Sequence, residues 1–371
     1  MAEDEDEGPE EETAPGAAVE IPAPRENPAL FGHEAAEATL LQAYGSGRLP
    51  HAWLLTGPRG IGKATLAFRF ARFLFAQGGG GGLFAAAPAS LAVAPEHPVF
   101  RRVAAGGHAD LLVIERSLDP RRKKLRSEIV VDDTRAIAGF LRLTPAEGAW
   151  RVVVLDGADM MNRNAANALL KILEEPPQRS ALLVVSDNPG RLLPTIRSRC
   201  RLLALKPLAP AVVSEALRQY RPDLSAGDRA LLVQLAEGSI GRALELAAAG
   251  GIGLYRSLMR LLDGLPAIDG VALHALADRL QRAEGEEGFR LLSELLPGWL
   301  ARMVALAAGG APAAVPEEAA AMRRLAARRG LDQWVEVWEK LTHLFTQADS
   351  VNLDRKQVVL NAFFALEEAA R

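Results

Sequence analysis

Hydrophobic positions in residues 25–206 follow two patterns. Five short runs are continuously apolar, at 52–56 (AWLLT), 111–115 (LLVIE), 152–156 (VVVLD), 182–186 (LLVVS) and 202–206 (LLALK). Continuous runs of this length are typical of strands that crossover helices bury on both faces. Because helix-period stretches lie between several of the runs, the pattern predicts a parallel α/β domain.

The pattern changes after Pro207. Residues 209–250 have the spacing of two or three short helices with a turn at Gly238–Ser239, and residues 264–270 (GLPAIDG) have the composition of a linker. Residues 271–371 are predicted to be helical, with breaks at Pro297 and at 308–316. We therefore expect four segments, namely a tail (1–24), the α/β domain (25–206), a small helical lid (207–263) and a helical bundle (264–371).

Composition narrows the class of protein. The chain has 371 residues, 49% of them hydrophobic and 24% charged, which predicts two or three globular domains and excludes a wholly disordered or fibrous chain. One cysteine, Cys200, excludes an intramolecular disulfide and a cysteine-based zinc cluster. The acidic N-terminus is unlike a secretory signal, and no apolar run is long enough for a membrane span. We expect a cytosolic protein.

Charge is distributed unevenly along the chain. Residues 1–24 contain nine acidic side chains and no base, so the net charge of −3 conceals a mildly basic remainder. The tail is interpreted as a solvated disordered segment, with an interaction arm as the alternative. The run Arg121–Arg126 (RRKKLR) is interpreted as a solvated loop, with a contact for DNA phosphates or for the acidic tail as the alternative. Residues 78–98 are rich in Gly, Ala and Pro and predict a mobile loop.

The segment Thr56–Thr65 (TGPRGIGKAT) carries the first candidate chemistry. It follows an apolar run and precedes a helical stretch, and Gly57, Gly62 and Lys63 have the spacing G-x-x-x-x-G-K. Glycines such as these and Gly60 let backbone N–H groups turn toward a phosphate, and the lysine neutralises its charge. The segment predicts a phosphate-binding loop for ATP or ADP.

Two positions that magnesium chemistry needs are changed. The residue after the lysine is normally Ser or Thr, whose hydroxyl binds Mg²⁺, but here it is Ala64. Thr65 lies about 100° further round the helix and is a poor substitute. Asp156 ends an apolar run, where it either retains some metal binding or makes only local hydrogen bonds, and Gly157 after it cannot orient an attacking water. We expect weak nucleotide binding, no metal site and little ATPase activity.

A second candidate lies in residues 194–200 (PTIRSRC). A short helix here, just after a predicted buried strand, would bring Arg199 to the edge of the domain. Guanidinium groups stabilise the charge of a transferring phosphoryl group and can act from a neighbouring subunit. A solvated surface arginine is the alternative. Residues 162–175 predict a helix that starts at Asn162 and stops at Pro176, with Glu174 exposed.

Six segments together resemble a known family. The chain resembles the clamp-loader branch of the AAA+ ATPases, and within it the delta-prime family of bacterial DNA polymerase III subunits, over about residues 25–370. The segments are HAWLLTGPRGIGKATLA (51–67), GHADLLVIE (107–115), LDGADMMNRNAANALLKILEEPP (155–177), LLPTIRSRC (192–200), GSIGRALEL (238–246) and NLDRKQVVLNAFFAL (352–366).

This resemblance implies a fold and a role. It implies a P-loop AAA+ domain, a helical lid and a C-terminal collar that joins five subunits into a ring. Such rings open a sliding clamp and place it on primed DNA. A delta-prime-like chain would be the rigid stator beside the motor (gamma/tau) and delta subunits. Arg199 would then act catalytically on the nucleotide of the adjacent motor subunit.

The chain also departs from the family pattern. Motor subunits carry a four-cysteine zinc module where this chain has a Gly/Ala/Pro-rich loop at about residues 76–106, so zinc is not expected. Gly241 stands where motor subunits have a nucleotide-sensing arginine, and Arg242 follows it. An active motor ATPase of the same loader is the alternative, against which Ala64 and Gly157 argue. A stand-alone nucleic-acid-binding module is a third possibility, disfavoured by the net charge and the sparse aromatic residues.

Overall fold

The computed structural model describes residues 21–77, 88–118, 125–147, 150–282, 285–310, 316–351 and 353–371. Nearly all of the acidic tail, the glycine-rich part of the predicted loop and most of the basic run at 121–126 lie outside these ranges. The described chain divides into two compact units. Unit 1 extends to Leu224 and includes Gly238–Gly241, whereas unit 2 comprises Ser225–Glu237 and Arg242–Arg371. The predicted boundaries after residues 206 and 263 stay predictions.

Unit 1 contains a five-stranded parallel sheet, which confirms the predicted fold class. The strands are β1 (Ala52–Thr56), β2 (Leu111–Ile114), β3 (Arg151–Asp156), β4 (Ser180–Ser186) and β5 (Arg201–Ala204). Their order across the sheet is β2-β3-β4-β1-β5, and every neighbouring pair is parallel. Each strand overlaps one of the five apolar runs. The carboxyl ends of all strands therefore meet at one edge, where ligands bind in open α/β sheets.

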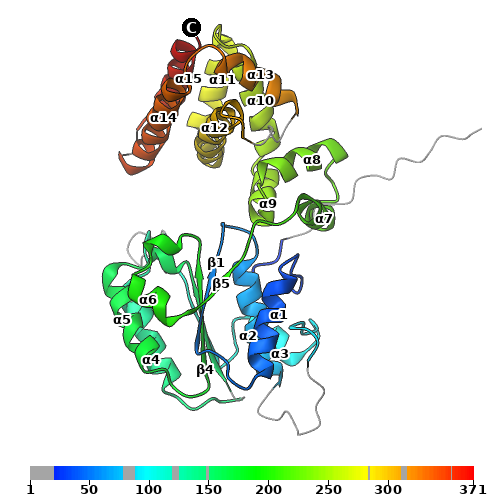
Figure 1. The fold of residues 1–371 in the computed structure, drawn as a ribbon, viewed down its shortest axis with the longest axis vertical. Coiled ribbons are helices and arrows are strands. Elements are labelled where there is room, and N and C mark those ends of the chain that lie inside the picture. The colour runs from blue at the N-terminus through cyan, green and yellow to red at the C-terminus, as the bar shows by residue number, and fades with distance from the viewer. Residues whose placement is uncertain are drawn as a thin grey trace, which may run out of the picture. The chain divides into compact units, whose positions relative to one another are not determined.

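Helices cover both faces of this sheet (Figure 1). On one face α1 (Glu34–Gly45), α2 (Lys63–Gln77) and α3 (Pro98–Ala104) enclose a core that includes Leu66 and Phe70. On the other face α4 (Val131–Leu141), α5 (Arg163–Glu174) and α6 (Pro194–Arg199) enclose a second core. The single-turn helices η1 (Ala158–Met160) and η2 (Pro189–Arg191) follow β3 and β4, and α7 (Pro210–Tyr220) completes the unit.

Helix α3 corrects one prediction, because it occupies the end of the segment 76–106 that was assigned to a loop. Pro98 at its first position is suited to a helix start, and the ring nitrogen Nδ1 of His97 accepts a hydrogen bond from the Val99 N–H at 3.2 Å. The side chains of Val99, Phe100 and Val103 are buried. Three apolar residues at helical spacing therefore stabilise a helix in a stretch whose composition had predicted none.

Unit 2 is entirely helical in its described residues. Its helices are α8 (Ala226–Leu235), α9 (Ile240–Ala248, entering from unit 1), α10 (Gly251–Asp263), α11 (Gly270–Gln281), α12 (Glu286–Ala307), α13 (Pro316–Ala326), α14 (Leu331–Val351) and α15 (Arg355–Ala370). The predicted linker at 264–270 does separate two helices. The predicted break at Pro297 is wrong, because α12 continues through it. Leu296 and Trp299 beside the proline are buried, and this packing offsets the backbone hydrogen bond that proline cannot make.

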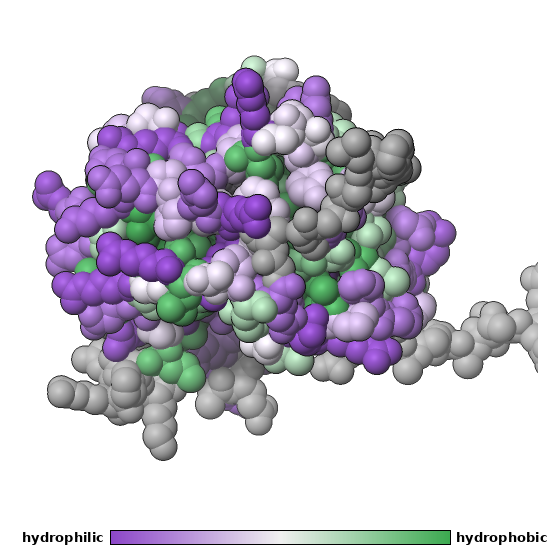
Figure 2. All heavy atoms as spheres, turned by 90° about the horizontal axis from the view of Figure 1, so that it is seen from below, coloured by the Kyte–Doolittle hydropathy of each residue, from purple (hydrophilic) through white to green (hydrophobic). Residues whose placement is uncertain are grey.

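The surface has the polarity of a protein that keeps its apolar side chains inside. Figure 2 shows one face, on which hydrophilic side chains predominate and hydrophobic ones form small separate groups. In the described parts of the chain, none of the helices combines the length and the apolar character that crossing a membrane requires.

Candidate nucleotide site and an arginine at the sheet edge

The phosphate-loop segment has the predicted geometry. It connects the end of β1 to the start of α2, and α2 begins at Lys63. Gly57, Gly60 and Gly62 have φ angles of 145°, 76° and 105°, which glycine adopts readily and other residues do not. A Cβ atom on Gly57 would lie 2.4 Å from the carbonyl oxygen of Leu205. The loop is thus a glycine-dependent backbone turn ahead of a helix N-terminus, which fits a phosphate group.

The side chain of Lys63 is buried, with 3% of it exposed, and its ammonium group is fully engaged. Its Nζ atom donates to the carbonyl oxygens of Gly57 at 2.8 Å and Pro58 at 2.5 Å. It also forms an ion pair with Oδ1 of Asp187 at 2.7 Å. An ammonium group has three N–H donors, so each has an oxygen within reach. No sequence pattern had connected this lysine to Asp187, which directly follows β4.

Carboxyl groups gather at this sheet edge and give the site negative charge. Because β4 lies between β3 and β1, the residue after β4 stands between Asp156 and the phosphate loop. Burial raises the pKa of Asp156 to about 6, the charges of Asp187 and Glu115 add to the rise, and Lys63 opposes it. The backbone N–H of Gly157 also opposes the rise in the pKa of Asp156, because it favours the charged carboxylate.

The first of the two predicted departures from a magnesium site, Ala64, lies in the first turn of α2. It follows Lys63 directly and precedes Thr65, and both Ala64 and Thr65 are half-buried. Within the described residues, no group of three or more His, Cys, Asp or Glu side chains is arranged so that it could hold a metal ion. Poor magnesium binding stays a prediction. Its basis is that the methyl group of Ala64 offers no oxygen where the hydroxyl ligand is needed.

Residues 238–241 pack directly against the phosphate loop. The Ser239 hydroxyl donates to the carbonyl of Arg59, and the Gly241 N–H donates to the carbonyl of Gly60, both at 2.8 Å. A Cβ atom on Gly241 would lie 2.8 Å from the Cα of Gly60. Position 241 therefore requires glycine for a close backbone approach. The sequence analysis had recognised only the absence of an arginine there.

Arg199 is exposed at the end of the predicted short helix. It is the last residue of α6, and its Nη1 donates to the carbonyl of Thr195 at 3.1 Å. Its Nη2 donates to Oε1 of Glu174, the last residue of α5, at 2.8 Å. Cys200 beside it is buried, and burial raises the pKa of its thiol to about 11, which keeps it protonated. The guanidinium is thus held at the surface by two oxygens of its own chain.

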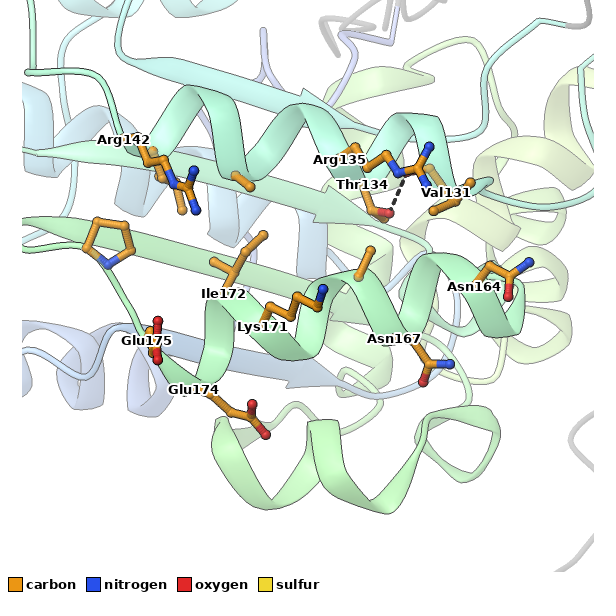
Figure 3. A pocket seen from close by; sticks show the side chains of 14 residues that line it. Val131, Thr134, Arg135, Arg142, Asn164, Asn167, Lys171, Ile172, Glu174 and Glu175 are labelled. Carbon is orange, nitrogen blue, oxygen red and sulfur yellow. Dashed lines mark hydrogen bonds between the residues drawn. The ribbon is translucent and has the colours of Figure 1, made fainter.

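A groove of about 690 Å³ lies between α4 and α5. In Figure 3 the side chains of Lys171 and Arg142 extend into the space between these helices, and Glu174, which also lines the groove, extends from the end of α5. The lining also contains Arg135 and Glu175. Charges of both signs line the groove, which shares no lining residue with the phosphate loop.

Fold and loop together define a class. A parallel five-stranded sheet, with a glycine loop and its lysine at the end of β1 and an acid at the end of β3, is the fold of a P-loop NTPase domain of the AAA+ type. Residues 32–209 match the family model described as "DNA polymerase III, delta subunit". The α/β part of the chain is thus similar to this family, and the match covers just under half of the chain.

Individual relatives agree with the family model. The chain is 40% identical over 204 residues to DNA polymerase III subunit delta' of Pseudomonas aeruginosa, covering 55% of this chain and 57% of that protein. It is 31% identical over 200 residues to the delta' subunit of Bacillus subtilis, covering 54% of each chain. It is 30% identical over 272 residues to the tau subunit of Escherichia coli, covering 71% of this chain and 39% of that one. The chain thus spans about half the length of the delta' relatives it matches.

Proposed function

We propose that this protein is a stator subunit of a DNA polymerase III clamp loader, which supports the loading of a sliding clamp onto primed DNA. In this role it hydrolyses little or no ATP itself and supplies Arg199 to the nucleotide site of a neighbouring motor subunit. The observation that carries the proposal is the exposed guanidinium of Arg199 at the end of α6, on a chain whose own site lacks a hydroxyl at position 64.

The neighbours in this proposal are motor (gamma/tau) and delta subunits, with the clamp and DNA bound by the assembly in the cytoplasm. Support comes from the delta' subunit of Pseudomonas aeruginosa, whose identity to this chain is 40%, against 30% for the tau subunit of Escherichia coli. An active motor subunit is the second candidate, favoured by the intact glycine loop and lysine. It requires a metal ligand and a water-orienting group, and Ala64 and Gly157 provide neither.

Reconstitution with motor and clamp-opening subunits tests the proposal. The measurement is ATP hydrolysis stimulated by clamp and primed DNA, with wild-type chain, Arg199→Ala, Arg197→Ala or Lys63→Ala. Arginine fingers contribute about 10³-fold or more to turnover at the site they serve. We therefore expect Arg199→Ala to abolish turnover at the one site that it serves. The total turnover should fall by that site's share, because the other sites keep their own arginines.

Arg197 is the matched control, because it is an exposed arginine two residues earlier in the same helix. Arg197→Ala and Lys63→Ala should leave the stimulated turnover near the wild-type value. Wild-type turnover by the complex that contains Arg199→Ala would refute the proposal that Arg199 acts at a neighbouring site. Turnover by the isolated chain at the rate of a motor subunit would favour the second candidate instead.

A further inference from the structure

We propose that Asp187 is an internal competitor of the nucleotide, occupying the N–H of Lys63 that a bound phosphate would need. This inference goes beyond the proposed stator role. It rests on that role in one respect only, namely that the loop is a nucleotide site. Asp187 would set how weakly phosphate-bearing ligands bind to the loop. A well-formed loop would then seldom hold nucleotide, because its lysine is already paired.

The geometry of Lys63 carries the argument. Two of its three N–H donors go to Gly57 and Pro58, which belong to the same loop, so these bonds are part of the loop's own conformation. The third goes to a carboxylate on a different element, 2.7 Å away. A phosphate in the loop needs a donor from this lysine, and the donor that does not hold the loop together is the one bound to Asp187.

Asp187 is held in this position by the sheet. Ser186, the last residue of β4, pairs in register with Thr56, the last residue of β1, so position 187 falls beside the start of the phosphate loop. The backbone N–H of Asp187 donates to Oδ1 of Asp159 at 3.0 Å, which fixes the turn. The side chain of Asp187 is 39% exposed. An incoming anion therefore meets the carboxylate on its way to the buried ammonium.

Two physical effects oppose phosphate binding. A hydrogen bond between an ammonium and a carboxylate is about twice as strong as a neutral one, and phosphate must displace it. A carboxylate left beside a bound phosphate also repels it, most strongly where the surroundings exclude water. Asp156 adds a second carboxyl at the same edge. Both effects require the charge of Asp187, so removing that charge while keeping the shape should strengthen binding.

The test uses the full chain and the variant Asp187→Asn, which keeps size and hydrogen bonding but removes the charge. Binding of ADP, inorganic pyrophosphate and adenosine is measured by calorimetry. We expect ADP and pyrophosphate to bind about tenfold tighter to the variant, since a neutral acceptor holds the lysine less strongly. Adenosine has no phosphate, so its affinity should not change. Asp132→Asn is the matched control, because Asp132 also forms an ion pair, with Arg135, but lies on α4.

Thermal unfolding without ligand checks that Asp187→Asn is folded, and Asp187→Ser provides a second variant if it is not. Unchanged or weaker ADP binding by a folded variant would overturn the proposal, as would an equal gain for adenosine or the absence of ADP binding in both proteins. None of these results depends on a neighbouring subunit. They are therefore distinguishable from a failure of the stator role, which the Arg199→Ala complex decides.

Discussion

Lys63 and Ala64 are adjacent in the first turn of α2, and together they separate phosphate binding from magnesium binding. The lysine lies in the expected place for a phosphate, whereas the alanine removes the oxygen that would hold the metal. Restoring activity is harder than restoring this one ligand. Gly157 has a φ of 78°, a conformation in which a side chain costs about 1–2 kcal/mol, so a glutamate there would be strained.

Ala64→Ser is predicted to make nucleotide binding depend on magnesium without making the chain an ATPase. The new hydroxyl supplies a metal ligand, but Gly157 still leaves the attacking water without a base. Titration of ADP with and without Mg²⁺ measures the first effect, and phosphate release measures the second. Ala64→Val adds volume without oxygen and should show neither effect. Equal ADP affinity with and without Mg²⁺ in Ala64→Ser would contradict the prediction.

At the scale of elements, the local sequence predicted where α5 begins, but it did not predict the burial of one acidic side chain. Asn162 accepts a hydrogen bond from the Ala165 N–H and starts α5, as its residue type predicts. In unit 2, Glu318 on α13 is completely buried, and Nη2 of Arg302 on α12 lies 3.5 Å from its Oε1. No sequence pattern marked Glu318, because a glutamate on a helix is ordinarily solvated.

The stability of the chain is predicted to fall as pH rises from about 4.5 to about 7, through Glu318. Burial raises the pKa of Glu318 from 4.5 to about 7. In this range the folded chain keeps a proton that the unfolded chain releases, so raising the pH favours unfolding. The contribution is fully present below pH 4.5 and is lost above about pH 7.

Glu318→Gln should remove this contribution, which is about 1–3 kcal/mol. Urea unfolding at pH 5 and pH 7.5 measures it as a loss of stability in the wild type that the variant lacks. Glu294→Gln, an exposed glutamate on α12, should behave like the wild type. The same pH dependence in Glu318→Gln and wild type would show that another group is responsible.

At the scale of the whole molecule, the charge predicts weak DNA binding by the isolated chain. The net charge of −3 and the 5% of aromatic residues give the chain little with which to bind DNA alone. We predict that the isolated chain binds primed DNA no tighter than about 10⁻⁶ M at physiological salt. Fluorescence anisotropy at 50 and 200 mM salt checks this, with a reconstituted loader as the positive control. Nanomolar binding by the isolated chain would instead support a stand-alone nucleic-acid-binding module.

Much of this protein could be predicted from local sequence. The five strands, the glycine loop with Lys63, the helix that Asn162 starts and the short helix that carries Arg199 were all predicted. Each depends on neighbouring residues, through apolar runs, glycine spacing or a capping side chain. Helix α3 and the unbroken α12 were missed, because in both cases burial outweighs a composition or a proline that disfavours helix.

Contacts between distant segments depended on the tertiary structure alone. The sequence determined that the loop could cradle a phosphate and that position 64 lacked a metal ligand, because both are properties of adjacent residues. It did not determine that Asp187 would form an ion pair with Lys63 or that Glu174 would form one with Arg199. Nor did it determine that Gly241 would pack against Gly60. These pairs follow from strand order and helix packing, which bring together side chains that the chain itself keeps far apart.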